Sequence, residues 1–178
     1  MTQTGRIEGL RIPSRDIPQA DLLDDVLACA RIVSNGIMQG QTMSYQRIAT
    51  ALRKTERQGR YYRRAAEILG LILSSKNSSR ITPLGRRVLS ADDEHRRAML
   101  TEIVSGLAIF QTILRALRES GGSLNKDEIE ELLESETLLG TKEMRRRRRT
   151  TIISWLNSLR LVRESDDIIS LRGIRPKL

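Results

Sequence analysis

The sequence predicts a mainly α-helical protein with two tandem winged helix-turn-helix units and small β-hairpin wings. Apolar residues recur at helical spacing through most of the chain, and two short apolar segments with polar turns are typical of β-hairpins. The order of three helices and a hairpin occurs twice, with the third helices about 90 residues apart. That order is the organisation of a winged helix-turn-helix unit. The repeat is one of pattern and not of residue identity.

The first helix is predicted by apolar residues at helical spacing over residues 20–33, and Asn35-Gly36 is a typical end for it. Residues 37–43 are expected to form a loop. Ser44 can then cap a short second helix, because its hydroxyl can accept a hydrogen bond from a backbone N–H of the first turn.

A capping box at Thr55-Glu56-Arg57-Gln58 predicts the start of the third helix, which Gly70 ends after Leu69. A hairpin is expected over residues 71–82, with Ser74 to Ser79 as its turn. Pro83 suits the first position of a short helix that closes this half.

The second half repeats this order after a connecting helix expected over residues 92–105. Apolar spacing predicts a helix over residues 107–119, and Asn125-x-x-Glu128 is a second capping box. A long helix over residues 142–160 and a hairpin over residues 161–171 complete the pattern. We therefore expect four parts: a flexible leader (1–18), a first winged-helix domain (19–90), a connector helix (91–106) and a second winged-helix domain (107–178).

Composition favours a polyanionic partner. The 178 residues carry 31 Lys and Arg against 22 Asp and Glu, a net charge of +9, and 39% are hydrophobic, which is enough for a core. One Cys rules out an intrachain disulfide, and one His rules out His-rich metal sites. No apolar run reaches the roughly 18 residues that cross a bilayer, and no signal peptide begins the chain. We expect a cytoplasmic protein without a membrane partner.

The third helix has one apolar side and one basic side. Tyr62 and Ala66 fall on the side that can pack, and the cationic set centres roughly 140° away. Arginine can bind phosphate or guanine with two parallel hydrogen bonds, and glutamine can pair with adenine. The predicted base-reading set is Arg57, Gln58, Arg60, Tyr61 and Arg64, with Lys54, Lys76 and Arg80 as phosphate contacts. The alternative is a solvated basic face.

Five consecutive arginines, 145–149, open the long helix of the second half and cover every side of it. Its buried stripe passes near Arg145, Arg148 and Arg149, so at least one of these should pair with an acid of the preceding helix. The outward set predicted to contact DNA is Arg146, Arg147, Thr150, Thr151 and Ser154. The alternative is an acid–base clasp between neighbouring helices. The first hairpin turn is cationic and should touch DNA, whereas the acidic turn at residues 164–167 should avoid it.

No catalytic motif, metal-ligand set or cofactor motif is found in the sequence. It has no His-x-Lys, no glycine-rich phosphate loop, and no carboxylate cluster in the setting of a metal-dependent nuclease. Cys29 lies on an apolar stripe and is expected in the core, and His95 is expected to be solvated or to cap a helix. We expect a protein that is not an enzyme and that uses no cofactor.

Three segments resemble a known family: RQGRYYRRAAEILGLI at residues 57–72, ITPLG at 81–85 and RRRTTIISWLN at 147–157. They resemble the tandem winged-helix modules of type II and type IIS restriction endonucleases and related nicking enzymes. In that family these modules recognise DNA and a separate domain cuts it. The resemblance implies a nuclease domain or subunit as a partner. It leaves open whether the chain is a recognition module, a specificity subunit or a stand-alone binder.

The sequence thus predicts sequence-specific binding of double-stranded DNA. If about six phosphates are neutralised, the affinity should fall roughly 10³-fold between 50 and 200 mM salt. One alternative is a transcriptional regulator of the same fold, which would dimerise on a palindrome. A second is an adaptor whose basic helices bind acidic proteins. The target sequence and the oligomeric state stay open.

Overall fold

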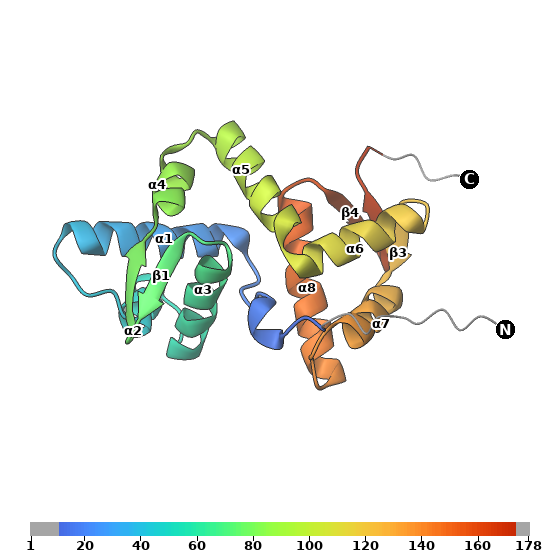
Figure 1. Ribbon diagram of the computed structural model, residues 1–178, viewed down its shortest axis with the longest axis horizontal. Helices are drawn as coiled ribbons and strands as arrows, with labels where there is room; N and C mark the ends of the chain where they lie inside the picture. Colours follow the sequence, from blue (N-terminus) through green and yellow to red (C-terminus); the bar gives the residue numbers. More distant parts are fainter. Residues whose placement is uncertain (1–10, 174–178) are drawn as a thin grey trace.

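The computed structural model describes residues 11–173 and is mainly α-helical, with two small antiparallel sheets (Figure 1). A short 3₁₀ turn at Ser14–Asp16 precedes the first helix. The helices are α1 (Leu23–Met38), α2 (Tyr45–Ala51), α3 (Glu56–Ile68), α4 (Pro83–Ser90), α5 (Asp93–Gly106), α6 (Ala108–Glu119), α7 (Lys126–Glu136) and α8 (Lys142–Ser158). The strands are β1 (Ile72–Ser75), β2 (Ser78–Ile81), β3 (Ser123–Asn125), β4 (Val162–Ser165) and β5 (Ile168–Leu171).

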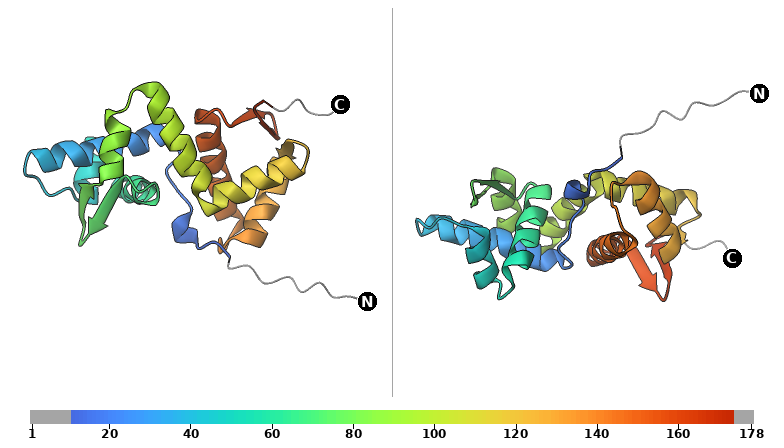
Figure 2. Two further views of the ribbon diagram at one scale, coloured as in Figure 1. Left: turned by 45° about the horizontal axis from the view of Figure 1, so that its top comes forward. Right: turned by 90° about the horizontal axis from the view of Figure 1, so that it is seen from below.

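The chain forms two halves that α5 links, as Figures 1 and 2 show. In the first half α1, α2 and α3 pack on one another, and the β1–β2 hairpin lies against α1 and α3. In the second half α7 packs on α8, and a sheet with the order β3-β5-β4 lies beside α6 and α8. One hydrophobic cluster continues through both halves, so they share an interface.

The third helices of the two halves end in the same way. The residue after each C-cap has a left-handed φ, +67° at Gly70 and +59° at Arg160, where glycine is the favoured residue. The next residues make matching backbone bonds, Leu71 N–Ala66 O and Leu161 N–Leu156 O at 2.9 Å, then Thr82 N–Leu71 O and Arg172 N–Leu161 O at 3.0 Å. Every counterpart lies 90 residues further along, so a structural repeat accompanies the predicted pattern.

Each hairpin pairs with a third segment of the chain that the sequence did not predict. In the second half β3 pairs with β5, with Leu124 opposite Ile169. In the first half a single antiparallel bridge joins Met43 to Ser79 on β2. These segments are too short to show an alternating pattern, because β3 has three residues and runs directly into the Asn125 cap of α7.

The predicted turn of the first hairpin is too long. Ser74 and Ser79 are paired strand residues whose hydroxyls lie 2.8 Å apart, and only Lys76 and Asn77 form the turn. Both turn residues have a positive φ, 45° and 59°, as a two-residue hairpin loop of type I′ requires.

The predicted end of the first helix is also wrong. Asn35 and Gly36 lie inside α1, which continues to Met38 and stops before Gly40, at φ +70°. Gly36 has a packing role, because a Cβ there would lie 2.0 Å from the sulfur of Met43. The glycine lets the loop cross close to the helix.

The expectation of a flexible leader is wrong for residues 11–18, and residues 1–10 lie outside the described part of the chain. Ile12 forms a parallel bridge with Thr137, and Ile17 is buried in the core. In both views of Figure 2 this segment runs between the two halves. Its order comes from long-range contacts that local sequence does not reveal.

Both predicted capping boxes are present, at Thr55 with Gln58 and at Asn125 with Glu128. The position of α3 on α2 depends on Gly59, where a Cβ would lie 2.6 Å from the Ala49 Cβ. The same Cβ would lie 2.6 Å from a backbone carbonyl of α2, so only glycine allows this close crossing. No single helix among residues 11–173 is long and apolar enough to span a bilayer.

Candidate nucleic-acid interface

Two arginines on the exposed side of α3 are held by phenols. Arg60 donates to the Tyr45 hydroxyl at 2.7 Å, and its guanidinium lies 4.4 Å from the centre of that ring. Arg57 donates from Nε to the Tyr61 hydroxyl at 2.7 Å. Within residues 11–173 neither arginine has a carboxylate within 4.0 Å. The phenols therefore restrict both side chains without neutralising them.

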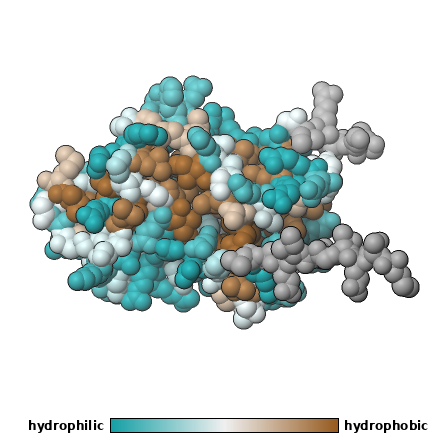
Figure 3. Space-filling model, viewed as in Figure 1, coloured by the Kyte–Doolittle hydropathy of each residue, from teal (hydrophilic) through white to brown (hydrophobic). Residues whose placement is uncertain are grey.

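The first wing is fixed to the same surface by its turn. Asn77 accepts hydrogen bonds at Oδ1 from the Tyr45 backbone N–H (3.2 Å) and the Arg63 guanidinium (2.8 Å), and it donates to Gln46 at 2.9 Å. Lys76 and Arg80 are exposed, and neither forms an ion pair within the described residues. Figure 3 shows hydrophilic residues gathered over α2 and α3 on this part of the molecule.

Two predicted DNA contacts of the first half are instead bound to carboxylates. Lys54 pairs with Asp25 at 3.1 Å. Arg64 pairs with Asp16 at 3.3 Å and Glu67 at 3.2 Å, and it also donates to the Arg15 backbone carbonyl. Because Arg64 holds the segment before α1 against α3, its first role is structural. Each of its three guanidinium nitrogens donates a hydrogen bond within the protein, so the structure does not support the prediction that Arg64 reads a base.

Gln58 has part of its amide committed. Its carbonyl oxygen accepts a hydrogen bond from the Thr55 backbone N–H at 3.1 Å, as the capping box predicts. The exposed amide nitrogen remains as a donor, so the two-bond pairing with adenine expected of Gln58 would require the cap to open.

The arginines of α8 are largely paired with acids. Arg145 lies 3.1 Å from Glu134, and Arg149 bonds to Glu130, so the expected pairing with the preceding helix is confirmed. Arg146 and Arg147 are exposed, as predicted, and lie 3.7 and 3.6 Å from Glu130 and Glu143. The Arg147–Glu143 pair is exposed on both sides and is therefore weak, whereas Glu130 is buried and is shared between Arg146 and Arg149. The guanidinium groups of Arg146 and Arg147 stay exposed, so these two charges can still meet a ligand.

The hydroxyl residues of the predicted α8 set do not share one surface. Thr151 is buried and donates to Asp21 at 3.0 Å, so its prediction as a DNA contact is wrong. Thr150 is exposed and Ser154 is half-buried. Thr151 belongs to the joint between the halves, where Trp155 also donates to the Ala20 carbonyl at 2.9 Å and stacks on Phe110.

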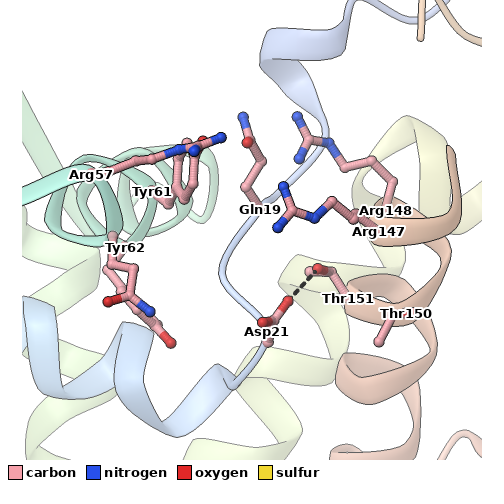
Figure 4. Close-up of a pocket in the computed structure, with 10 residues that line it drawn as sticks. Gln19, Asp21, Arg57, Tyr61, Tyr62, Arg147, Arg148, Thr150 and Thr151 are labelled. Carbon is pink, nitrogen blue, oxygen red and sulfur yellow. Dashed lines mark hydrogen bonds between the residues drawn. The ribbon is translucent and has the colours of Figure 1, made fainter. Parts of the chain in front are cut away.

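A cleft of about 310 Å³ opens between α3 and α8 (Figure 4). In Figure 4 the guanidinium groups of Arg147 and Arg148 point toward the space beside Gln19, across from Arg57 and Tyr61. The lining residues are Gln19, Asp21, Arg57, Gln58, Tyr61, Tyr62, Arg147, Arg148, Thr150 and Thr151. Helical periodicity gives each basic helix its own outward side, and it contains no signal that the two helices face one cleft.

Arg148 is the most unusual residue of this cleft. Only 6% of it is exposed, its Nε has no hydrogen-bond partner, and no carboxylate within residues 11–173 pairs with it. Burial, with a smaller effect of neighbouring Arg147, lowers the pKa of Arg148 to about 10. The guanidinium therefore remains charged at neutral pH. Helical spacing placed Arg145, Arg148 and Arg149 near the buried stripe but did not indicate which of the three is buried.

The second wing carries negative charge. Lys126 contacts Glu164 at 2.9 Å and Asp167 at 3.6 Å, and the hydrogen bond to Glu164 raises the pKa of Lys126. This lysine offsets only part of the acidic turn, so the surface beside β4 and β5 suits DNA poorly. No group of three or more His, Cys, Asp or Glu side chains within residues 11–173 is arranged to hold a metal ion.

The fold and these surfaces define a mainly helical protein with a repeated arrangement of three helices and a hairpin, and with a basic surface on its first half. The chain belongs to the DUF7226 family, a domain of unknown function, whose model matches residues 31–161. The matched part includes α3, α8 and the first hairpin. No curated protein and no solved structure matches the chain.

Proposed function

We propose that each half is a winged helix-turn-helix unit and that the protein binds double-stranded DNA, with α3 as the main recognition helix. Each half contains, in order, a helix, a strand or single β-bridge, two further helices and a hairpin. This shared order supports the assignment. In such units the third helix enters the major groove and the wing lies beside the backbone.

The observation that carries the proposal is the pair of phenol-held arginines, Arg57 and Arg60, beside the free cations Lys76 and Arg80. A restricted guanidinium loses less conformational freedom when it binds, and its remaining N–H groups suit guanine or phosphate. The four charges lie on one helix and its own wing, which is the layout that groove and backbone contacts need.

The contribution of α8 is smaller in this proposal. Acids of α7 pair with Arg145 and Arg149, and the second wing is acidic. Arg146 and Arg147 remain for phosphate contacts. The first half would therefore supply most of the affinity, and the second half would supply the joint that orients it.

Selection of bound sequences from a random duplex pool tests this function. We expect enrichment of a short motif, because arginine at base edges discriminates between bases by about 1–3 kcal/mol. Equal retention of every sequence would show that the protein contacts only the phosphate backbone, and would contradict base reading by α3. Loss of binding to all duplex DNA at 50 mM salt would contradict the proposal.

The symmetry of the selected site separates the related roles. The resemblance to restriction-enzyme modules favours a monomer on an asymmetric site, whereas a regulator of the same fold would select a palindrome and dimerise. An adaptor for acidic proteins would bind them in the presence of excess generic duplex. Incubation of plasmid with Mg²⁺ shows directly whether the chain cuts DNA.

A further inference from the structure

The cleft between α3 and α8 is lined by counterpart positions of the structural repeat. Arg57 and Arg147 are 90 residues apart, as are Gln58 and Arg148, and all four line the cleft. The two third helices thus turn the same part of their surface toward each other. The segment that carries Gln19 and Asp21 lies between them (Figure 4).

The cleft carries an excess of positive charge. Three guanidinium groups line it, and Asp21 is the one carboxylate among the lining residues. That carboxylate already accepts a hydrogen bond from Thr151 at 3.0 Å. Arg147 has a single exposed partner, Glu143, at 3.6 Å, which leaves most of its donors unused.

Arg148 gives the second, independent indication of a ligand. A buried charge that lacks an ion partner is costly, and buried polar atoms in native proteins are normally hydrogen-bonded. Arg148 is 94% removed from solvent, since 6% is exposed, and its Nε has no partner. The half-buried Arg145 and Arg149 on α8 each pair with a carboxylate of α7, and Arg149 does so although its own Nε also lacks a partner. Arg148 differs from them because it is buried and has no carboxylate, so this site is not an ordinary interhelical clasp.

We propose that this cleft binds one phosphate group, held by Arg147 and Arg148 from α8 and by Arg57 from α3. Guanidinium groups bind phosphate oxygens through paired, charge-assisted hydrogen bonds, and Gln19, Gln58 and Thr150 add polar atoms at the rim. A volume of about 310 Å³ admits a phosphate or a mononucleotide but not a duplex. The phosphate belongs either to a small soluble ligand or to a backbone that passes over the opening.

A phosphate in this position would contact both third helices at once. It would offset the repulsion among the three arginines and stabilise the relative position of the two halves. Arg57 is shared with the proposed duplex interface, whereas Arg60, Lys76 and Arg80 lie outside the cleft lining. The phosphate site therefore does not depend on sequence recognition by α3.

The test is thermal unfolding and titration calorimetry of the full chain with sodium phosphate, against sodium chloride at equal ionic strength. We expect phosphate to raise the unfolding temperature and chloride to leave it unchanged. Arg148→Met should weaken phosphate binding about tenfold or more, since one charge-assisted contact is lost. Arg57→Gln, at an exposed position, gives the same test in a variant with no buried change. The control is Arg118→Gln, on the exposed side of α6.

Equal stabilisation of the wild type, Arg57→Gln and Arg118→Gln by phosphate would overturn the proposal, as would no effect of phosphate. A nucleoside monophosphate and a short duplex distinguish the sources. If phosphate competes with the duplex and both need Arg148, the backbone supplies the group. If the mononucleotide binds together with the duplex, the ligand is a small molecule. If the protein binds the duplex but phosphate has no effect, the phosphate site is wrong and the proposed DNA-binding function is unaffected.

Discussion

The salt dependence of duplex binding follows directly from the charges that the fold leaves unpaired. Four exposed cations of the proposed interface have no ion partner within the described residues: Arg57, Arg60, Lys76 and Arg80. Each neutralised phosphate contributes about −0.9 to the slope of log K against log salt. Four contacts give a slope of about −3.6, which is an affinity loss of about 10²-fold between 50 and 200 mM salt.

The same measurement decides whether α8 takes part. If Arg146 and Arg147 also meet phosphates, six contacts give a loss of about 10³-fold over that range. Fluorescence anisotropy of a labelled duplex at several salt concentrations gives the slope. Arg80→Gln should reduce its magnitude by about 0.9, and Arg118→Gln should leave it unchanged. A slope near zero, or one that both variants alter equally, would refute the reasoning.

Gly85→Ala should unfold the first half, because a Cβ would lie 2.1 Å from the Leu71 carbonyl; circular dichroism checks this. Gly59→Ala should lower the free energy of unfolding by about 1–3 kcal/mol through overpacking. The matched control, Gly106→Ala on α5, meets no atom within 4 Å and should be neutral or gain up to about 1 kcal/mol in urea titrations. Trp155→Ala should cost about 3–5 kcal/mol, and a smaller loss would contradict its place in the joint. Burial raises the pKa of Cys29 to about 12, so a thiol reagent at pH 8 should modify it only after unfolding.

The elements that local chemistry determines were predictable. Thr55 and Asn125 sit at capping boxes because a side-chain acceptor and a partner three residues on suffice to define a helix start. Gly70 likewise ends α3, since glycine favours the left-handed conformation. The elements that depend on distant partners were missed, among them β3 and the ordered segment around Ile17.

The candidate site likewise contains some residues whose positions the sequence predicts and others whose positions depend on distant contacts. The exposed positions of Arg57 and Arg60 follow from helical periodicity, and so were predictable. The pairing of Arg64 with Asp16 joins residues 48 apart, and no local pattern signals it. Arg148 stands among four other arginines, so its burial beside the cleft depends on how the halves pack. Ion-pair assignment therefore requires the tertiary structure.

The central claim is that α3 presents free, phenol-held guanidinium groups to a duplex. The most direct measurement is the dissociation constant of one duplex for Arg60→Gln and Arg118→Gln in the same buffer at 50 mM salt. We expect the affinity to fall about tenfold or more for the first variant and less than about twofold for the second. Equal affinities for both variants and the wild-type protein would contradict it.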